Sequence, residues 1–119
     1  EQARLEGRIK ELEEIIKNSY NSYVKKCVLC NKNCPKYLLE EYCLLNNDYR
    51  LSIASNHNTP VYILEKIYNY DSFNENLIKK LLYFNENCPV SILKKIYKNN
   101  KNYKEKVIKH PNWKLKDFE

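Results

Sequence analysis

Hydrophobic residues recur at helical spacing along most of this chain, and two stretches carry nearly the same pattern. In the stretch from Ile63 to Tyr68, apolar residues fall at i, i+1, i+4 and i+5, which puts them on one face of a helix. The same stripe returns 29 residues later, from Ile92 to Tyr97. No stretch sustains the apolar–polar alternation of a half-buried strand. The pattern therefore predicts an all-α protein.

The two stretches belong to a longer internal repeat. Asn56-His-Asn-Thr-Pro-Val-Tyr-Ile-Leu-Glu-Lys-Ile-Tyr68 matches the segment from Asn85 to Tyr97 at 9 of 13 positions. A degraded copy begins at His110, 25 residues after Asn85, and another contains Asn33, 25 residues before Asn58. Self-similarity at this period predicts stacked helical units that bury their apolar faces against one another, with atypical copies at the ends.

Each unit divides into two helical pieces. Polar residues followed by Pro60 or Pro89 are typical of a helix start, because proline suits the first turn. The second piece is predicted from Ser72 to Phe84, and its apolar face comprises Phe73, Leu77, Ile78, Leu81 and Leu82. Its counterparts are Tyr49–Ala54 and Tyr103–Ile108. The period is short for two full helices, so we expect one piece of each unit to be a single 3₁₀ or α turn.

This pattern resembles the leucine-rich variant repeat family over residues 33–118. The matching residues are Ile53-Ala54-Ser55-Asn56, Asn58-Thr59-Pro60, Ile63-Leu64 and Ile67. The resemblance implies units that pair an α-helix with a 3₁₀ helix in a right-handed superhelix. The expected fold is thus a short right-handed α/3₁₀ solenoid of about 25-residue repeats.

Four of the five cysteines crowd into a short segment, as Cys27-x₂-Cys30-x₃-Cys34-x₈-Cys43. In an intracellular chain such clustering favours metal ligands over disulfides, with packed or incidental thiols as the alternative. A straight helix from Pro35 would hold Cys34 and Cys43 ~13 Å apart, too far for one zinc ion. A cubane cluster tolerates a wider spacing, so either the helix is short or bent, or Cys43 is not a ligand.

Some leucine-rich variant proteins carry an iron–sulfur cluster in front of their repeats. That resemblance implies Cys27, Cys30, Cys34 and Cys43 as ligands of a 4Fe-4S cluster, with zinc as the alternative cofactor. Cys88 stands alone in the repeat register and is interpreted as a packed core residue.

The N-terminal residues form an apolar seam with spacings of 4, 3 and 4, made of Leu5, Ile9, Leu12 and Ile16. Ile at a and Leu at d favour a parallel two-stranded coiled coil, so residues 1–16 could join a homodimer or a hetero-coiled coil. The alternative is one amphipathic helix folded back on the repeats.

Three regions are expected along the chain. A helical arm, which is native, truncated or fused, covers residues 1–22. A cysteine-rich metal-binding knuckle at 23–46 merges with the first partial repeat, and helical repeats cover 47–119.

The net charge of +6 is unevenly placed, with eleven lysines against Glu86 and Glu105 in residues 77–116. The proposed basic ridge consists of Lys79, Lys80, Lys94, Lys95, Lys98, Lys101, Lys104, Lys106 and Lys109. Such a ridge could contact nucleic-acid phosphates or an acidic partner, and a solvated face is the alternative. Arg50 is the only arginine of the repeats, which weakens any base-specific proposal.

The sequence contains little that supports a catalytic function. A single glycine excludes the dinucleotide and P-loop fingerprints, which each need at least two. His57 and His110 precede helices and are expected to be solvent-facing loop residues, while Trp113 is expected to cap the core.

No apolar run reaches the length of a membrane span and no signal-peptide pattern opens the chain, so a cytoplasmic location and no membrane partner are expected.

The predicted function is therefore a non-enzymatic adaptor that docks a protein partner through a metal-capped repeat surface and the helical arm. The alternatives are a nucleic-acid-associated accessory factor that uses the basic ridge, and an iron–sulfur redox-responsive regulator.

Overall fold

The computed structural model describes residues 1–118, and these fold entirely as helices and connecting turns, with no strand among them. The α-helices are α1 (Gln2–Asn18), α2 (Ser22–Cys30), α3 (Lys36–Cys43), α4 (Asn47–Ala54), α5 (Val61–Asp71), α6 (Glu75–Tyr83), α7 (Val90–Asn99) and α8 (Lys104–Ile108). Two 3₁₀ turns, η1 (Lys101–Tyr103) and η2 (Leu115–Phe118), lie near the C-terminal end. The all-α prediction is confirmed.

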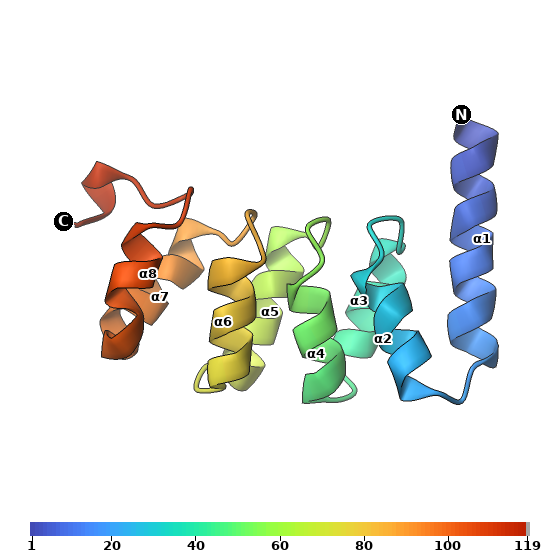
Figure 1. Cartoon of the computed structure of the whole chain (residues 1–119), viewed down its shortest axis with the longest axis horizontal. Coiled ribbons are helices and arrows are strands. Elements are labelled where there is room, and N and C mark those ends of the chain that lie inside the picture. Colours follow the sequence, from blue (N-terminus) through green and yellow to red (C-terminus); the bar gives the residue numbers. More distant parts are fainter. Residues whose placement is uncertain (119) are drawn as a thin grey trace.

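The helices stand side by side along the longest dimension of a molecule that measures 47 × 31 × 18 Å. In Figure 1 the helices α2, α4, α6 and α8 form a front row, and α3, α5 and α7 form a rear row behind it. The chain climbs each front helix, crosses the upper edge in a short loop and descends the next rear helix (Figure 1). We call the four upper loops, at residues 31–35, 56–60, 85–89 and 110–114, the capping loops.

The helix starts alternate between two kinds of residue, and each kind marks one row. The front helices α2, α4 and α6 begin after Asn21, Asn46 and Asn74, whose side-chain oxygens accept hydrogen bonds from backbone N–H groups of the first turn. The rear helices α3, α5 and α7 begin after prolines, at positions 35, 60 and 89. Proline lacks an N–H and has a fixed φ, so it opens a helix without losing a hydrogen bond.

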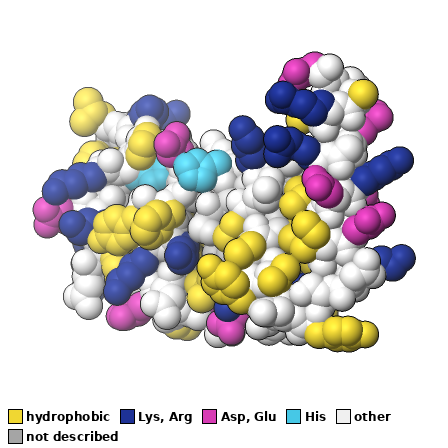
Figure 2. Space-filling view, turned by 45° about the vertical axis from the view of Figure 1, so that its right-hand side comes forward, with side chains coloured by type: hydrophobic (Ala, Val, Ile, Leu, Met, Phe, Trp, Pro, Cys, Tyr) yellow, Lys and Arg dark blue, Asp and Glu magenta, His cyan; other side chains and the backbone are white. Residues whose placement is uncertain are grey.

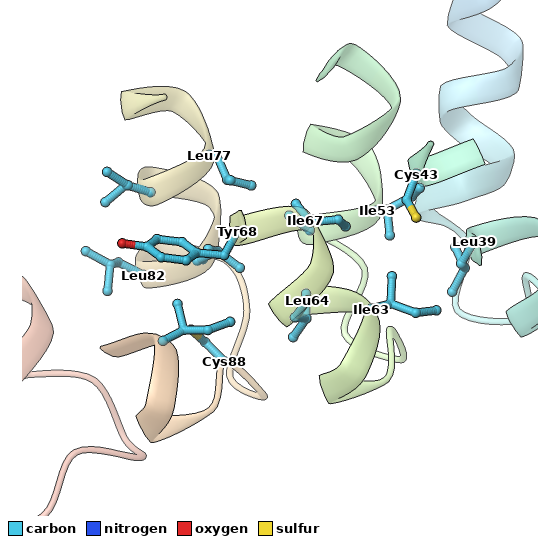
Figure 3. Close-up of a cluster of buried hydrophobic side chains, with 14 of the residues drawn as sticks. Leu39, Cys43, Ile53, Ile63, Leu64, Ile67, Tyr68, Leu77, Leu82 and Cys88 are labelled. Atoms are coloured by element: carbon cyan, nitrogen blue, oxygen red, sulfur yellow. The ribbon is translucent and has the colours of Figure 1, made fainter. Parts of the chain in front are cut away.

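The two rows bury their facing sides in one continuous core. The apolar stripe of α5 is fully enclosed, with Ile63, Leu64 and Ile67 at 0% exposure. Figure 3 shows these side chains between those of α3 and α4 on one side and those of α6 and the next capping loop on the other. α4 contacts α2 and α6 along the front row and α3 and α5 across it, so its apolar side chains are covered by the helices around it.

Buried asparagines connect one capping loop to the next. Asn56 is 1% exposed, and its side-chain amide donates to the carbonyls of Leu29 (2.8 Å) and Asn31 (2.9 Å). Asn85, also 1% exposed, repeats the contact one unit further on, with the carbonyls of Ala54 (2.7 Å) and Asn56 (3.3 Å). Each amide thus satisfies carbonyl groups at the end of the preceding front helix, which have no partner within that helix.

His110 occupies the same position in the last capping loop. Its Nδ1 accepts the backbone N–H of Asn112 at 3.1 Å, so Nε2 carries the proton that is donated to the Asn85 carbonyl at 2.9 Å. The corresponding side-chain oxygens of the asparagines accept the N–H two residues on, at Asn33, Asn58 and Asn87. With His110 at 4% exposure, the prediction of a solvent-facing residue is wrong. We call Asn31, Asn56, Asn85 and His110 the polar ladder.

A second set of asparagines reinforces the ladder from its outer side. Asn58 donates its side-chain amide to the Lys32 carbonyl at 2.6 Å, and Asn87 donates to the carbonyl of His57. Asn112 donates to the carbonyls of residues 86 (2.7 Å) and 88 (2.8 Å). The pairs at residues 56/58, 85/87 and 110/112 each therefore bond to the capping loop before them.

Three details differ from the sequence-based expectations. Both helices of the pairs α4–α5 and α6–α7 are α-helical, and 3₁₀ geometry occurs only in η1 and η2 among the described residues. Phe73, expected on the apolar face of α6, precedes that helix and is 83% exposed. Residues 23–46, expected to form a metal knuckle, fold as most of α2, a capping loop and α3.

The C-terminal end of the stack is covered by Trp113, as expected. Its ring is 7% exposed, stacks on Tyr97 with centroids 5.2 Å apart, and meets Phe118 edge-on at 5.5 Å. The Asp117 carboxylate accepts the backbone N–H of Lys114 at 2.7 Å and lies 3.7 Å from the Lys94 ammonium. The C-terminal turn η2 and the preceding capping loop therefore pack against α7 and cover the end of the core.

Replacing a ladder residue should destabilise the whole stack. Asn85→Ala leaves the buried Ala54 carbonyl without its partner and removes the bonds to the Asn56 carbonyl and from the Asn87 N–H, so we expect a loss of about 2–4 kcal/mol in the free energy of unfolding. Urea unfolding followed by circular dichroism measures it. Asn69→Ala, at an exposed position of α5, is the matched control and should change stability by less than about 0.5 kcal/mol. Equal effects of both variants would contradict a structural role for the ladder.

Candidate functional sites

The edge opposite the capping loops carries exposed apolar side chains at a regular interval. Tyr20, Leu45 and Tyr70 follow one another at spacings of 25 residues, in the turns after α1 and α3 and in the last turn of α5. Tyr20 is fully exposed, and Leu45 and Tyr70 are 60% and 56% exposed. These turns lie along the bottom of Figure 1. The interval equals the spacing of Asn31 and Asn56. Tyr20 and Leu45 hold equivalent places directly before the helix caps Asn21 and Asn46, while Tyr70 matches Leu45 in lying ten residues after the proline that precedes its helix.

Two more residues widen this surface, which we call the apolar edge: Tyr20, Leu44, Leu45, Tyr70 and Phe73. Leu44 is 53% and Phe73 is 83% exposed. None of the five belongs to the buried core, so packing does not account for their apolar character. In the next unit the place of Tyr70 is taken by Asn99, which ends the apolar edge after α6. Contiguous exposed apolar groups mark interaction sites on protein surfaces.

An ion pair holds the middle of the apolar edge in place. Arg50 on α4 bonds to Asp71 at the end of α5 through Nε (2.5 Å) and Nη2 (3.3 Å), and both side chains are more than four-fifths buried. A third donor, Nη1, meets the Cys43 carbonyl at the end of α3 at 3.0 Å. The guanidinium also lies 5.0 Å from the centre of the Tyr70 ring. One arginine of α4 thereby joins the C-terminal ends of two helices, α3 and α5. The sequence interpretation gave it no such role.

The four clustered cysteines separate into two pairs. Cys27 and Cys30 are exposed on the outer face of α2, because Val28 and Leu29 between them point into the core with 3% and 0% exposure. An open groove of about 430 Å³ adjoins both thiols. Its other lining residues are Tyr23, Lys26, Asn31 and Ser52. A spacing of i, i+3 puts two side chains on one helix face.

Cys34 and Cys43 are buried at opposite ends of α3. Burial, reinforced by the nearby Cys30, raises the pKa of the Cys34 thiol to about 12, and burial also raises the pKa of Cys43. Their sulfurs face backbone carbonyls, that of Pro35 at 3.8 Å and that of Glu40 at 3.1 Å. Both are therefore neutral thiols that pack in the core. Cys88, in the same register as Cys34, also has a pKa raised to about 12 by burial, in line with a packed residue.

This arrangement does not bring the four predicted ligands together. α3 runs unbroken from Lys36 to Cys43, so its ends are ~12 Å apart at 1.5 Å per residue. Within residues 1–118 no group of three or more His, Cys, Asp or Glu side chains is placed to hold a metal ion. The four-cysteine cluster, whether iron–sulfur or zinc, stays a prediction from the sequence.

The nine lysines of the proposed ridge are divided between the two rows. Lys79 and Lys80 lie on α6 in the front row, whereas Lys94 and Lys95 lie on α7 in the rear row (Figure 1). On the front face the lysines accompany aromatic rings: the ammonium of Lys80 is 4.9 Å from the Phe84 ring centre, and that of Lys106 is 5.8 Å from Tyr83. Figure 2 shows basic and hydrophobic side chains interleaved there, on the left of the view.

A cavity of about 340 Å³ opens beside these two rings, and both histidines line it. His57 is exposed, as expected, while His110 forms the inner wall and is engaged in the polar ladder. The sequence interpretation did not single out Tyr83 and Phe84. These two rings stand out by their 49% and 55% exposure next to lysines, a feature that is visible in the structure and not in the sequence.

The seam of α1 is partly used inside the chain. Ile16 is buried in the core at 2% exposure and Leu12 packs against it, while Leu5 and Ile9 higher on the helix are half-buried. The Tyr37 hydroxyl on α3 also donates a hydrogen bond to the Glu13 carboxylate of α1. The lower half of α1 therefore folds against α2 and α3, and its upper half rises past the capping loops (Figure 1).

The chain matches no protein-family model, no curated protein and no solved structure. None of the helices in the described part of the chain combines the length and the apolar character needed to cross a bilayer.

The two classes of cysteine should differ in reactivity. In the reduced, folded protein we expect iodoacetamide to modify Cys27 and Cys30 quickly and to leave Cys34, Cys43 and Cys88 unmodified, because those three are buried and the high pKa of Cys34 and Cys88 keeps them as thiols. Mass spectrometry of peptides at successive times reports each site. The same reagent in urea is the control and should reach all five. Rapid labelling of Cys34 or Cys43 in the folded chain would contradict this assignment.

Proposed function

We propose that this chain is a short solenoid of helical repeats, resembling the leucine-rich variant family, that serves as a rigid scaffold for binding a protein partner. The observation that supports this most strongly is the 25-residue recurrence of Tyr20, Leu45 and Tyr70, all exposed. A recurring exposed apolar residue contributes nothing to the core of a single chain, and it exposes hydrophobic surface to water. Such a position is expected where a partner covers it.

The spacing of the apolar edge suits one kind of partner. Neighbouring packed helices lie 8–10 Å apart, so equivalent turns in successive units recur at about that distance. An α-helix laid along the edge repeats its apolar face every seven residues, a rise of ~10.5 Å. We therefore propose an amphipathic helix as the partner segment, with apolar side chains between Tyr20, Leu45 and Tyr70.

A second function, association with nucleic acid, is supported by one observation. Lys80 and Lys106 lie beside the exposed rings of Phe84 and Tyr83 at the mouth of a cavity, so cations for phosphates and rings for stacking occur together. Two of the ridge lysines are engaged in ion pairs within the chain, Lys94 with Asp117 and Lys109 with Glu105. These pairs reduce the charge available to a polyanion, and protein binding is preferred for that reason.

Charged substitutions on the apolar edge test the preferred function. Tagged wild-type protein and the double variant Tyr20→Lys/Leu45→Lys are compared for the proteins that they retain from a cell extract, with quantification by mass spectrometry. Both positions are exposed, so the variant should fold normally. We expect a defined set of proteins whose recovery falls at least tenfold in the variant, because two ammonium groups would be buried in the interface.

Leu115→Lys is the matched control, since Leu115 is 88% exposed but lies in η2, away from the apolar edge. It should retain the same proteins as the wild type. Nuclease treatment and a titration of labelled duplex DNA at two salt concentrations are run in parallel. Equal recovery by all three proteins, or recovery that depends on intact nucleic acid, would contradict the apolar edge as the binding site and support the second function.

A further inference from the structure

Two of the clustered cysteines lie outside the core of the fold. Cysteine is among the most buried residue types, and Cys34, Cys43 and Cys88 follow that rule with exposures of 7%, 0% and 0%. Cys27 and Cys30 are exceptions to this rule, because both are exposed on one face of α2. Neither belongs to the hydrophobic core. An exposed pair with helical i, i+3 spacing needs a chemical explanation.

The geometry of the pair suits one soft metal ion. Side chains at i and i+3 have Cβ atoms about 5–6 Å apart on one helix face. Two thiolates bonded at ~2.3 Å to a tetrahedral zinc ion have sulfurs about 4 Å apart, which this spacing allows. The Cys30 sulfur lies 3.5 Å from the Ser52 carbonyl and 3.6 Å from the Ser55 hydroxyl, and that hydroxyl donates to the same carbonyl at 2.8 Å. These contacts hold the Cys30 sulfur at a fixed place beside α4, and groups around a metal ligand orient it in this way.

The groove around the pair holds no further ligand for zinc. Its other residues are Tyr23, Lys26, Asn31 and Ser52, with no His, Asp or Glu among them. Cys34 and Cys43 are turned into the core and bond to carbonyls of their own helix region. One chain therefore offers two of the four sulfurs that a closed zinc site takes, and two positions on the metal stay open.

A second copy of the same surface would complete the site. Two α2 helices related by a two-fold axis would bring four thiolates to one ion, and a two-fold interface uses the same patch of each partner. A zinc ion with four thiolates carries a net charge of −2. Lys26, which lines the groove in each copy, supplies a positive charge from each side to offset it. Tyr23, 69% exposed one turn before Cys27, adds apolar surface to the contact.

We propose that Cys27 and Cys30 form half of a zinc site that joins two copies of this chain through α2. The bonds formed are four Zn–S bonds, and the four thiol protons are released to solvent as the metal binds. This site uses two of the four cysteines that the sequence suggested as ligands and leaves the core of the chain unchanged. It is independent of the apolar edge.

Cobalt binding to the full-length chain tests the proposal, because tetrahedral Co²⁺–thiolate centres have strong visible and charge-transfer absorption. Reduced, metal-free protein is titrated with Co²⁺ under anaerobic conditions, and zinc is then added as a competitor. We expect saturation at one Co²⁺ per two chains, displacement by zinc, and a metal-dependent dimer by sedimentation analysis. Cys27→Ser and Cys30→Ser should each abolish the absorption and the metal-dependent dimer.

Cys34→Thr is the matched control, since threonine occupies the equivalent position at Thr59 and is buried there. It should bind Co²⁺ like the wild type. Saturation of the wild type at one Co²⁺ per chain would overturn the proposal, and so would loss of binding in Cys34→Thr with folding intact, because both point to ligands within one chain. Absence of the cobalt absorption, or an iron–sulfur absorption in anaerobically purified protein that requires Cys34 and Cys43, would overturn it as well.

Discussion

Asn56 and Asn85 of the polar ladder each bond to two neighbouring segments at once, and this constrains the relative position of the helices. The amide group of Asn85 closes the carbonyl end of the preceding front helix, while its side-chain oxygen holds the N–H of Asn87 in its own loop. Without Asn85 the buried Ala54 carbonyl would have no partner, and an unpaired buried carbonyl costs about 1–3 kcal/mol. A loop that moved away from its neighbour would lose several bonds together. The ladder thus constrains the spacing between capping loops, and the apolar stripes fill the space between the rows.

A consequence of this constraint is that the two edges of the molecule are free to differ. The upper edge holds the ladder, in which Asn56, Asn85 and His110 are buried and hydrogen-bonded to the preceding capping loop. On the lower edge, folding uses the Arg50–Asp71 pair and the helix caps Asn21, Asn46 and Asn74, whereas the exposed turn residues beside them lie outside the core. Apolar residues recur there nonetheless, at Tyr20, Leu45 and Tyr70. The exposed thiols of α2 lie on a third surface, which the ladder also leaves free. The two proposals made for this chain use those two free surfaces.

Much of the fold could be predicted from the sequence, because helix starts and apolar stripes are local signals. Pro60 and Pro89 mark two starts directly, and the stripe from Ile63 to Tyr68 predicts the buried face of α5. The expected 3₁₀ pieces could not be judged from the period alone. A front helix of eight or nine residues, begun by an asparagine cap, fits within a 25-residue unit when the loops are short. Phe73 was misplaced because it continues the apolar spacing of α6 although Asn74 caps that helix after it.

The candidate sites were less accessible to sequence reasoning. The spacing of Cys27, Cys30, Cys34 and Cys43 indicates a metal, but which thiols face solvent depends on the register of α2 and α3, and α3 carries Cys43 into the core. His110 was expected to face solvent because its equivalence to Asn85 is visible only when hydrogen bonds are known. A histidine can replace asparagine there since its two ring nitrogens supply one donor and one acceptor. Helix register decides which cysteines are exposed, and tertiary hydrogen bonding decides where His110 lies. Neither can be read from a residue pattern.

Exchange of side-chain amide protons with solvent tests the polar ladder most directly. In a uniformly ¹⁵N-labelled sample, the side-chain NH₂ signals of Asn56 and Asn85 should exchange with deuterium only on the timescale of unfolding, because both protons are buried and bonded to backbone carbonyls. The NH₂ group of Asn69, exposed on α5, should exchange at once. If Asn56 and Asn85 exchange as fast as Asn69 in the folded protein, the ladder does not hold the units together.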